Sequence, residues 1–181
     1  MNCRCTFVFL FLTGLTLWGC SGIQTPSTEL WTAKPEFLEV DSQLFSVRIE
    51  PKKGELPYYT FFLLTLTNKG NADLMVDWNA SRYLFNGRAE GGLVFEGIDP
   101  AAVKTATVPP ETVAPGTVLS REIFPMRLIA WSPIKERTAN GRSITPGIFP
   151  PGENGIRLTV RNENGPIAIP LSVRIYKNGS P

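Results

Sequence analysis

The chain has 181 residues, no histidine and a formal net charge of +2. A charge this close to neutral argues against nucleic acid as a partner. The missing histidine excludes Ser-His-Asp and Cys-His catalysis and most zinc or copper sites. Carboxylate chemistry remains possible, and we predict no catalytic residue, no metal centre and no cofactor.

The N-terminal segment has the pattern of an export signal. Arg4 is the only charged residue in Met1–Cys5, and residues 6–18 form an uncharged apolar run that stops before the polar residues 21–26. A basic start followed by a short apolar run is typical of a signal peptide. Spanning a bilayer takes about 20 apolar residues, more than this run supplies. We predict that residues 1–19 are a signal peptide, not a transmembrane anchor.

The leader ends in Leu17-Trp18-Gly19-Cys20, which resembles the lipobox of bacterial lipoproteins. Leu17 and Gly19 match the aliphatic and small residues of that motif, whereas Trp18 departs from its usual small or β-branched residue. The resemblance implies cleavage before Cys20 and attachment of a diacylglycerol to its sulfur. A thiolate is a suitable nucleophile for that attachment, and two or three acyl chains anchor a protein durably. The alternative is an incidental cysteine in a retained leader.

The residue after the lipidated cysteine bears on location. In the lipoprotein family an Asp at that position often retains the protein in the inner membrane of a two-membrane cell. This chain has Ser21 there. The resemblance therefore implies a cell-envelope location, at the outer membrane facing the periplasm if the source has two membranes.

The rest of the chain divides into a tether and one domain. Residues 20–35 are polar, contain Pro26 and show no sustained period, so we predict a lipid-anchored tether. Residues 36–177 are expected to form a single β-sandwich domain. A chain of this size buries roughly 70% of its unfolded surface, which is enough for a core without disulfides.

The first half of the domain alternates apolar and polar residues. This pattern predicts a strand at 44–50 and a central strand at 58–67. A turn at 68–71 then leads into alternation over 74–78, which predicts a hairpin. The pair resembles the middle strands of immunoglobulin-like modules, and the resemblance implies that Trp78 packs between two sheets.

The middle of the domain is more broken. Residues 82–85 and 93–98 predict a hairpin or strand-loop-strand, 103–108 a short edge strand, 109–116 a rigid crossing, and 117–124 a further strand.

The C-terminal part alternates most regularly. Alternation over 156–160 and again over 167–175, around an Asn-Gly turn, predicts a hairpin that closes a sheet. No stretch shows a helical stripe. The fold class predicted is all-β: an immunoglobulin-like two-sheet sandwich of seven to nine strands, after the signal peptide and the short tether.

Four carboxylates could form a site. Asp73 and Asp77 are expected on the solvent face of one strand, and Glu96 and Asp99 flank a glycine. Two carboxylates about 5 to 9.5 Å apart can hydrolyse glycosides, and converging oxygen ligands can hold a cation such as calcium. The simpler interpretation, which we favour, is that they only solubilise an exposed face and a turn.

One long segment, 127–151, has no periodicity. It contains Trp131, Arg137, Arg142 and Phe149, and aromatic and arginine side chains dominate binding hot spots. We therefore consider it a candidate interaction loop for another envelope protein or an anionic envelope polymer. The alternative is that Trp131 and Phe149 fold back to cap the sandwich while the cations stay solvated.

Two functions remain open from the sequence. The first is a lipid-anchored cell-envelope protein that acts without catalysis, as a binding or accessory module attached to the membrane through Cys20. The second is a carboxylate-dependent domain that binds or processes glycans. Convergence of the carboxylates in a concave, aromatic-lined site would favour the second function.

Overall fold

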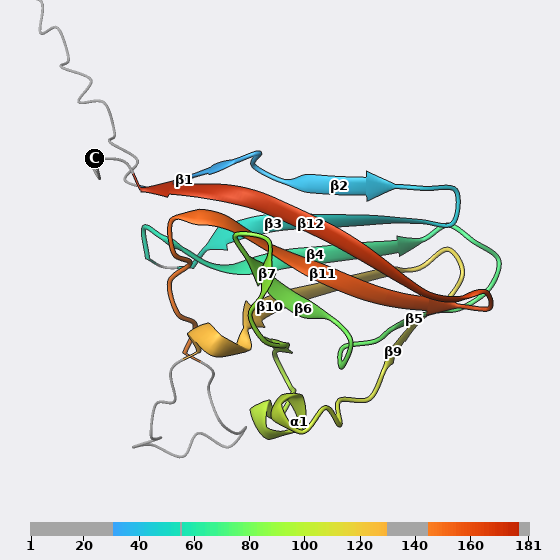
Figure 1. Cartoon of the computed structure of the whole chain (residues 1–181). Helices are drawn as coiled ribbons and strands as arrows, with labels where there is room; N and C mark the ends of the chain where they lie inside the picture. The colour runs from blue at the N-terminus through green and yellow to red at the C-terminus, as the bar shows by residue number, and fades with distance from the viewer. Residues whose placement is uncertain (1–30, 55, 130–144, 178–181) are drawn as a thin grey trace, which may run out of the picture.

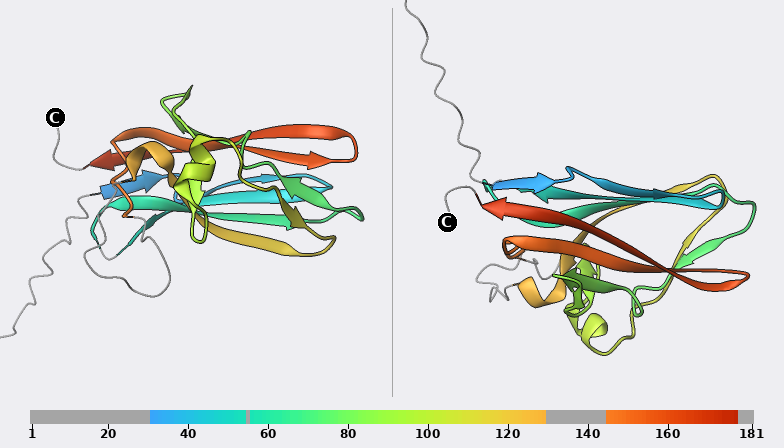
Figure 2. Two further views of the ribbon diagram at one scale, coloured as in Figure 1. Left: turned by 90° about the horizontal axis from the view of Figure 1, so that it is seen from below. Right: turned by 45° about the horizontal axis from the view of Figure 1, so that its top comes forward.

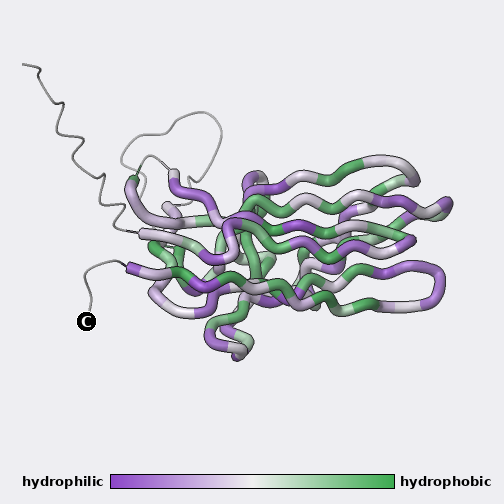
Figure 3. Tube along the Cα trace, turned by 90° about the horizontal axis from the view of Figure 1, so that it is seen from above, coloured by the Kyte–Doolittle hydropathy of each residue, from purple (hydrophilic) through white to green (hydrophobic). Residues whose placement is uncertain are grey.

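The computed structural model describes residues 31–54, 56–129 and 145–177. Two antiparallel sheets pack face to face (Figure 1), which confirms the predicted all-β two-sheet sandwich. Figure 3 shows hydrophobic and hydrophilic residues alternating along the strands, as expected when one face of each sheet is buried.

The first sheet contains, in spatial order, β1 (Trp31–Lys34), β12 (Gly165–Lys177), β11 (Gly152–Asn162), β5 (Leu74–Val76) and β9 (Glu111–Val113). Also in it are β6 (Arg82–Phe85), which pairs with β11, and β7 (Arg88–Ala89), which pairs with β6. The second sheet contains β2 (Leu38–Asp41), β3 (Phe45–Lys53), β4 (Tyr59–Asn68), β10 (Val118–Pro125) and β8 (Leu93–Phe95). Twelve strands in the described part exceed the seven to nine expected, because the sequence did not indicate the short strands β1, β2, β7 and β9.

The predicted hairpin after the central strand is wrong. β4 lies in the middle of the second sheet, whereas β5 belongs to the first, so the chain crosses between sheets at residues 69–73. Asn68 is fully buried, and its side-chain Nδ2 donates to the carbonyls of Ala72 and Val113, both at 2.8 Å. These hydrogen bonds hold a crossing instead of a two-strand turn.

β11 organises the first sheet because three strands pair with it. β12 pairs along its full length, and β5 and β6 share its other edge. The interruption between β5 and β6 is closed by Ser81, whose Oγ donates to the Asp77 carbonyl at 2.8 Å and accepts from the Thr159 amide at 3.0 Å. One hydroxyl thus replaces a missing rung of the ladder.

The core lies between the two sheets. Trp78 is 2% exposed, and its ring lies 4.6 Å from that of Phe95 in the opposite sheet, so its predicted place between the sheets is confirmed. Phe149 is fully buried between Phe62 of one sheet, 4.6 Å away, and Tyr83 of the other, 6.3 Å away. Aromatic side chains from both sheets therefore fill the interior.

The edge strand predicted at 103–108 is also wrong. Helix α1 (Pro100–Lys104) occupies that part of the chain, and Asp99 caps it by accepting from the Ala101 amide at 2.9 Å. An Asp followed by Pro is a typical helix start. The only other helical turn described, η1 (Met126–Leu128), is a 3-10 turn after β10. No helix in the described part is long and apolar enough to cross a membrane.

The folded domain begins earlier than predicted. Residues Trp31–Lys34, expected in the tether, form β1 and pair with Lys177–Arg174 of β12. Trp31 is only 7% exposed. The alternation that identifies a strand was too short here to be recognised from sequence.

Two prolines lie within β12. Pro166 and Pro170 face Arg161 and Arg157 of β11. Proline lacks an N–H, so it fits a ladder only where that group would point away from the partner strand. The β11–β12 pairing is therefore undisturbed, and the prolines belong to the other edge of β12.

The two ends of the sandwich are formed by different parts of the chain (Figure 2). At the terminal end, Trp31 pairs with Lys177 and Lys53 with Tyr59. At the distal end are the turns between β2 and β3, β4 and β5, β9 and β10, and β11 and β12. Both termini of the described domain therefore lie at the terminal end.

Tyr83 yields a prediction about alkaline stability. Its hydroxyl donates to Asn154 Oδ1 at 2.5 Å, and burial raises the pKa of Tyr83 well above its ordinary value. In the unfolded chain a tyrosine ionises near pH 10, whereas folding keeps this one protonated, so the free energy of unfolding should fall above about pH 10. The Tyr83→Phe variant should lose the pH dependence that Tyr83 adds to the free energy of unfolding. It should also be about 1 to 2 kcal/mol less stable at neutral pH.

Urea unfolding of both proteins between roughly pH 8 and pH 11 tests this, since the Tyr83 component has a slope of about 1.4 kcal/mol per pH unit. Parallel pH curves for the two proteins would contradict it.

Candidate functional site

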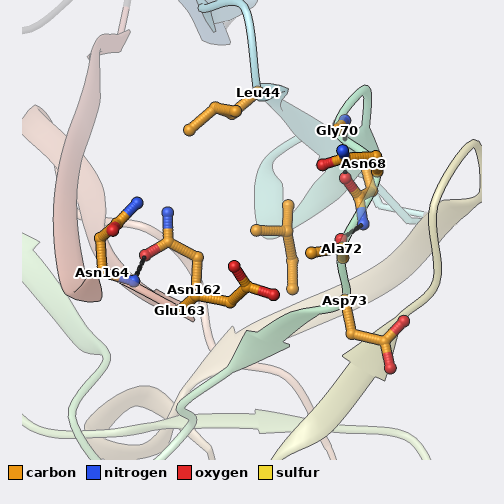
Figure 4. A pocket seen from close by; sticks show the side chains of 10 residues that line it. Leu44, Asn68, Gly70, Ala72, Asp73, Asn162, Glu163 and Asn164 are labelled. Atoms are coloured by element: carbon orange, nitrogen blue, oxygen red, sulfur yellow. Dashed lines mark hydrogen bonds between the residues drawn. The ribbon is translucent and has the colours of Figure 1, made fainter.

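A small cleft opens at the distal end of the sandwich (Figure 4). Its volume is about 100 Å³, and three turns that are far apart in the sequence line it. We call it the distal cleft. The lining residues are Leu44, Asn68, Gly70, Asn71, Ala72, Asp73, Leu74, Asn162, Glu163 and Asn164.

Asn68 holds the turns around the distal cleft together. Besides its two donated hydrogen bonds, its Oδ1 accepts from the Gly70 amide at 3.0 Å. Its backbone amide donates to the Thr117 carbonyl, and its carbonyl accepts from the Gly116 amide, both at 3.0 Å. Every polar atom of Asn68 is thus used, so this residue builds the cleft and is not available to a ligand.

The turn between β11 and β12 supplies the polar rim. The Asn164 amide donates to Asn162 Oδ1 at 2.9 Å, which fixes the turn. In Figure 4 the side chains of Asn162 and Glu163 point into the cleft, whereas Asp73 points away from it. Leu44, on the opposite side, is 44% exposed. A carboxylate and an amide therefore face an apolar wall across the distal cleft.

The distal cleft is too small for a whole ligand. Pockets for small molecules usually measure about 300 to 1,000 Å³. A space of about 100 Å³ fits one protruding side chain of a partner. The Glu163 carboxylate, across the cleft from the apolar Leu44, suits a long basic side chain, whose methylene groups can pack while its charged head stays at the rim.

Asp77 does not lie where we expected it. It is 8% exposed instead of facing solvent, because the regular alternation of β5 ends at Val76. Its Oδ2 accepts from Arg161 Nε at 2.9 Å and Nη2 at 2.5 Å, and its Oδ1 accepts from the Ala80 amide at 3.0 Å. Asp77 therefore stabilises the link between β5 and β6.

The other three carboxylates have separate surroundings. Asp73 borders the distal cleft, Asp99 caps α1, and Glu96 lines a groove of about 420 Å³ on the second sheet. That groove also contains Leu63 and residues 120–122 of β10. Within the described ranges, no group of three or more His, Cys, Asp or Glu residues could hold a metal ion.

The candidate interaction loop is described only in part. Phe149 is fully buried, and its amide donates to the Tyr59 carbonyl at 2.9 Å, so Phe149 is a core residue and not part of an exposed binding surface. Phe149 therefore folds back into the sandwich, where it lies between Phe62 and Tyr83. Trp131, Arg137 and Arg142 lie outside the described residues, as does Cys20.

Sequence reasoning missed Asn68, Asn162 and Glu163 as site residues. The sequence predicted a turn at the Asn-Glu-Asn-Gly segment, residues 162–165, and another that begins at Asn68. No local pattern indicates that the two turns lie side by side, because this depends on β5 pairing with β11, with Met75 opposite Arg161.

Comparison of the chain with protein-family models, curated proteins and solved structures finds no match.

The role of Asn68 can be tested by a substitution that preserves its shape. In Asn68→Asp the group that donates to the Ala72 and Val113 carbonyls becomes a carboxylate oxygen that repels them. A buried charge without a partner typically costs about 3 kcal/mol or more. The exposed Asn71→Asp in the same turn is the matched control, and its effect should stay within about 0.5 kcal/mol. Denaturant unfolding of both variants measures the difference; equal stability would show that Asn68 does not hold the turns.

Proposed function

We propose that this chain is a lipid-anchored cell-envelope protein that acts without catalysis, as a binding or accessory module. Cys20 carries the lipid and holds the sandwich at a membrane, at the outer membrane facing the periplasm in a two-membrane cell. The distal end of the sandwich presents its cleft to a partner.

The lipobox resemblance supports the anchor. The ten residues 21–30 separate Cys20 from the first strand. Fully extended, they reach at most about 35 Å, since each residue spans no more than about 3.6 Å. The tether thus limits how far the domain can move from the bilayer.

The observation that carries the proposal is the arrangement of the two ends. β1 begins at the terminal end, where β12 also finishes, and β11 runs from there to the turn that lines the distal cleft. A chain anchored before β1 therefore holds the distal cleft on the side away from its attachment. Such an arrangement suits a module that meets a partner above the membrane.

The lining of the distal cleft indicates the chemistry of that partner. Glu163 and the apolar Leu44 suit a lysine or arginine side chain of another envelope protein. An anionic envelope polymer would instead require the cations of the segment 127–151.

The carboxylates favour the binding module over the glycan-processing alternative. Asp77 is engaged by Arg161, and Asp99 by the start of α1. Glu96 and Asp73 line different hollows. A carboxylate pair that shares acid and base roles needs both groups to face one substrate.

The anchor predicts a specific mass and partition. The full chain, isolated from bacterial membranes, should begin at Cys20, carry added lipid mass and enter the detergent phase of a detergent–water partition. Cys20→Ala should lose both the lipid mass and the processing, whereas the neighbouring Ser21→Ala should keep them. A water-soluble chain that begins elsewhere, with no lipid, would refute the anchor.

The partner surface can be tested by crosslinking in living cells. A photoreactive residue at Asn164, in the distal cleft, should give a discrete adduct with an envelope protein, whereas one at the exposed Arg88 of β7 should not. Glu163→Gln should weaken the adduct, because the cleft loses the charge that attracts a basic side chain. An adduct unchanged by Glu163→Gln but lost in Trp131→Ala, Arg137→Ala would transfer the binding role to the segment 127–151.

A further inference from the structure

Aromatic and basic side chains meet at the terminal end of the sandwich. The Trp31 ring packs edge-on against Tyr58, with 6.5 Å between centroids. The Lys177 ammonium lies 5.9 Å from the Trp31 ring centroid, and that of Lys53 lies 5.0 Å from the Tyr59 ring. Two strand ends from different sheets thus each combine a ring with a cation.

Apolar side chains protrude at the same end. Leu56, in the β3–β4 connection, is 50% exposed, and Ile148, next to the buried Phe149, is 44% exposed. Tyr176, beside Lys177, is 41% exposed. Moving these three side chains from water into an apolar environment would be favourable.

Two acidic side chains near this end, Glu50 and Glu153, are engaged within the protein. Glu50 accepts from Lys52 at 2.5 Å and from Arg48 at 3.3 Å, and the Lys52 ammonium beside it lowers the pKa of Glu50. Glu153 accepts from Ser172 Oγ at 2.5 Å. These two carboxylates are held by groups of the protein, and the groups of the terminal end considered for contact are Leu56, Ile148, Tyr176 and the Lys177 ammonium.

We infer that the terminal end rests on an anionic lipid bilayer, with Leu56, Ile148 and Tyr176 at the headgroup level and Lys177 near the lipid phosphates. The inference rests on the proposed lipid anchor at Cys20. Aromatic rings favour the membrane interface, apolar tips gain by entering it, and lysines are attracted to anionic headgroups.

Because of the lipid anchor, a weak interaction between the terminal end and the bilayer is sufficient for contact. The ten-residue tether starts at the terminal end, so the lipid chains keep that end within about 35 Å of the bilayer. Tethering turns the second contact into an intramolecular one and raises its effective concentration. The bilayer is therefore the expected occupant of the terminal end. The N-terminal attachment lies at this end, and the charges there favour an anionic surface. Contact there orients the distal cleft away from the lipid.

A fluorescent probe at Leu56 tests the contact. The chain's cysteines are Cys3 and Cys5 in the leader and Cys20, whose sulfur is blocked in the lipidated protein. An introduced Leu56→Cys is thus the only site for a thiol-reactive, environment-sensitive dye. The full lipidated chain is placed in vesicles of phosphatidylethanolamine and phosphatidylglycerol. We expect a blue shift at position 56 and loss of its fluorescence when spin-labelled lipid is added.

Matched variants make the result specific. A dye at Asn71→Cys, in an exposed turn of the distal end, should show neither the shift nor the loss. Replacing Lys177 by Gln should lower the ratio of docked to undocked protein roughly fivefold on these vesicles. Lys69→Gln, at the distal end, should leave that ratio unchanged.

Two results would overturn the inference, and they are distinguishable. Equal quenching at positions 56 and 71 in a chain with confirmed lipid mass would refute bilayer contact and leave the anchor intact. Dye labelling of the chain without an introduced cysteine would show a free Cys20 thiol, which refutes the anchor and with it the contact.

Discussion

The sandwich depends on one constraint: wherever the buried chain leaves a ladder, its polar groups must still be hydrogen-bonded. Three side chains meet this need. Asn68 satisfies the crossing from β4 to β5, and Ser81 bridges the interruption opposite β11. Asn154 donates to the carbonyls of Pro150 and Gly152 and accepts from Tyr83. All three are fully buried. Without these three side chains, each place where the buried chain leaves a ladder would have unpaired polar groups in the interior.

These departures give the two ends different chemistry. At the terminal end, the strand termini bring rings and ammonium groups together around Trp31 and Tyr59. At the distal end, the turns collect amides and carboxylates around a small hollow. The ends are separated by the full length of β11, about 35 Å for eleven residues. A single core thus separates a surface suited to lipid from one suited to a basic side chain.

Alternation predicted the strands that are long and solvated on one face. Residues 44–50, 58–67, 117–124 and the C-terminal hairpin correspond to β3, β4, β10 and the β11–β12 pair. Alternation failed as a predictor where contacts with residues distant in sequence decide whether a side chain is buried. Asp77 was expected on the solvent face because nothing in the sequence marks the end of β5 at Val76. The distal cleft was not predictable either, because Asn68 and Glu163 are 95 positions apart and line one cleft only because β5, which follows Asn68, pairs with β11, which precedes Glu163.

The prolines of β12 have a consequence for neighbouring copies of the chain. β1 covers only Lys177–Arg174 of that strand, and no other described strand pairs with the same edge. Such an edge would accept a strand from another molecule, a risk that grows when many copies share one surface. Pro166 and Pro170 remove two of the donors that this pairing needs, and they lie four residues apart. The two prolines therefore make this edge of β12 a poorer template for a strand from another molecule.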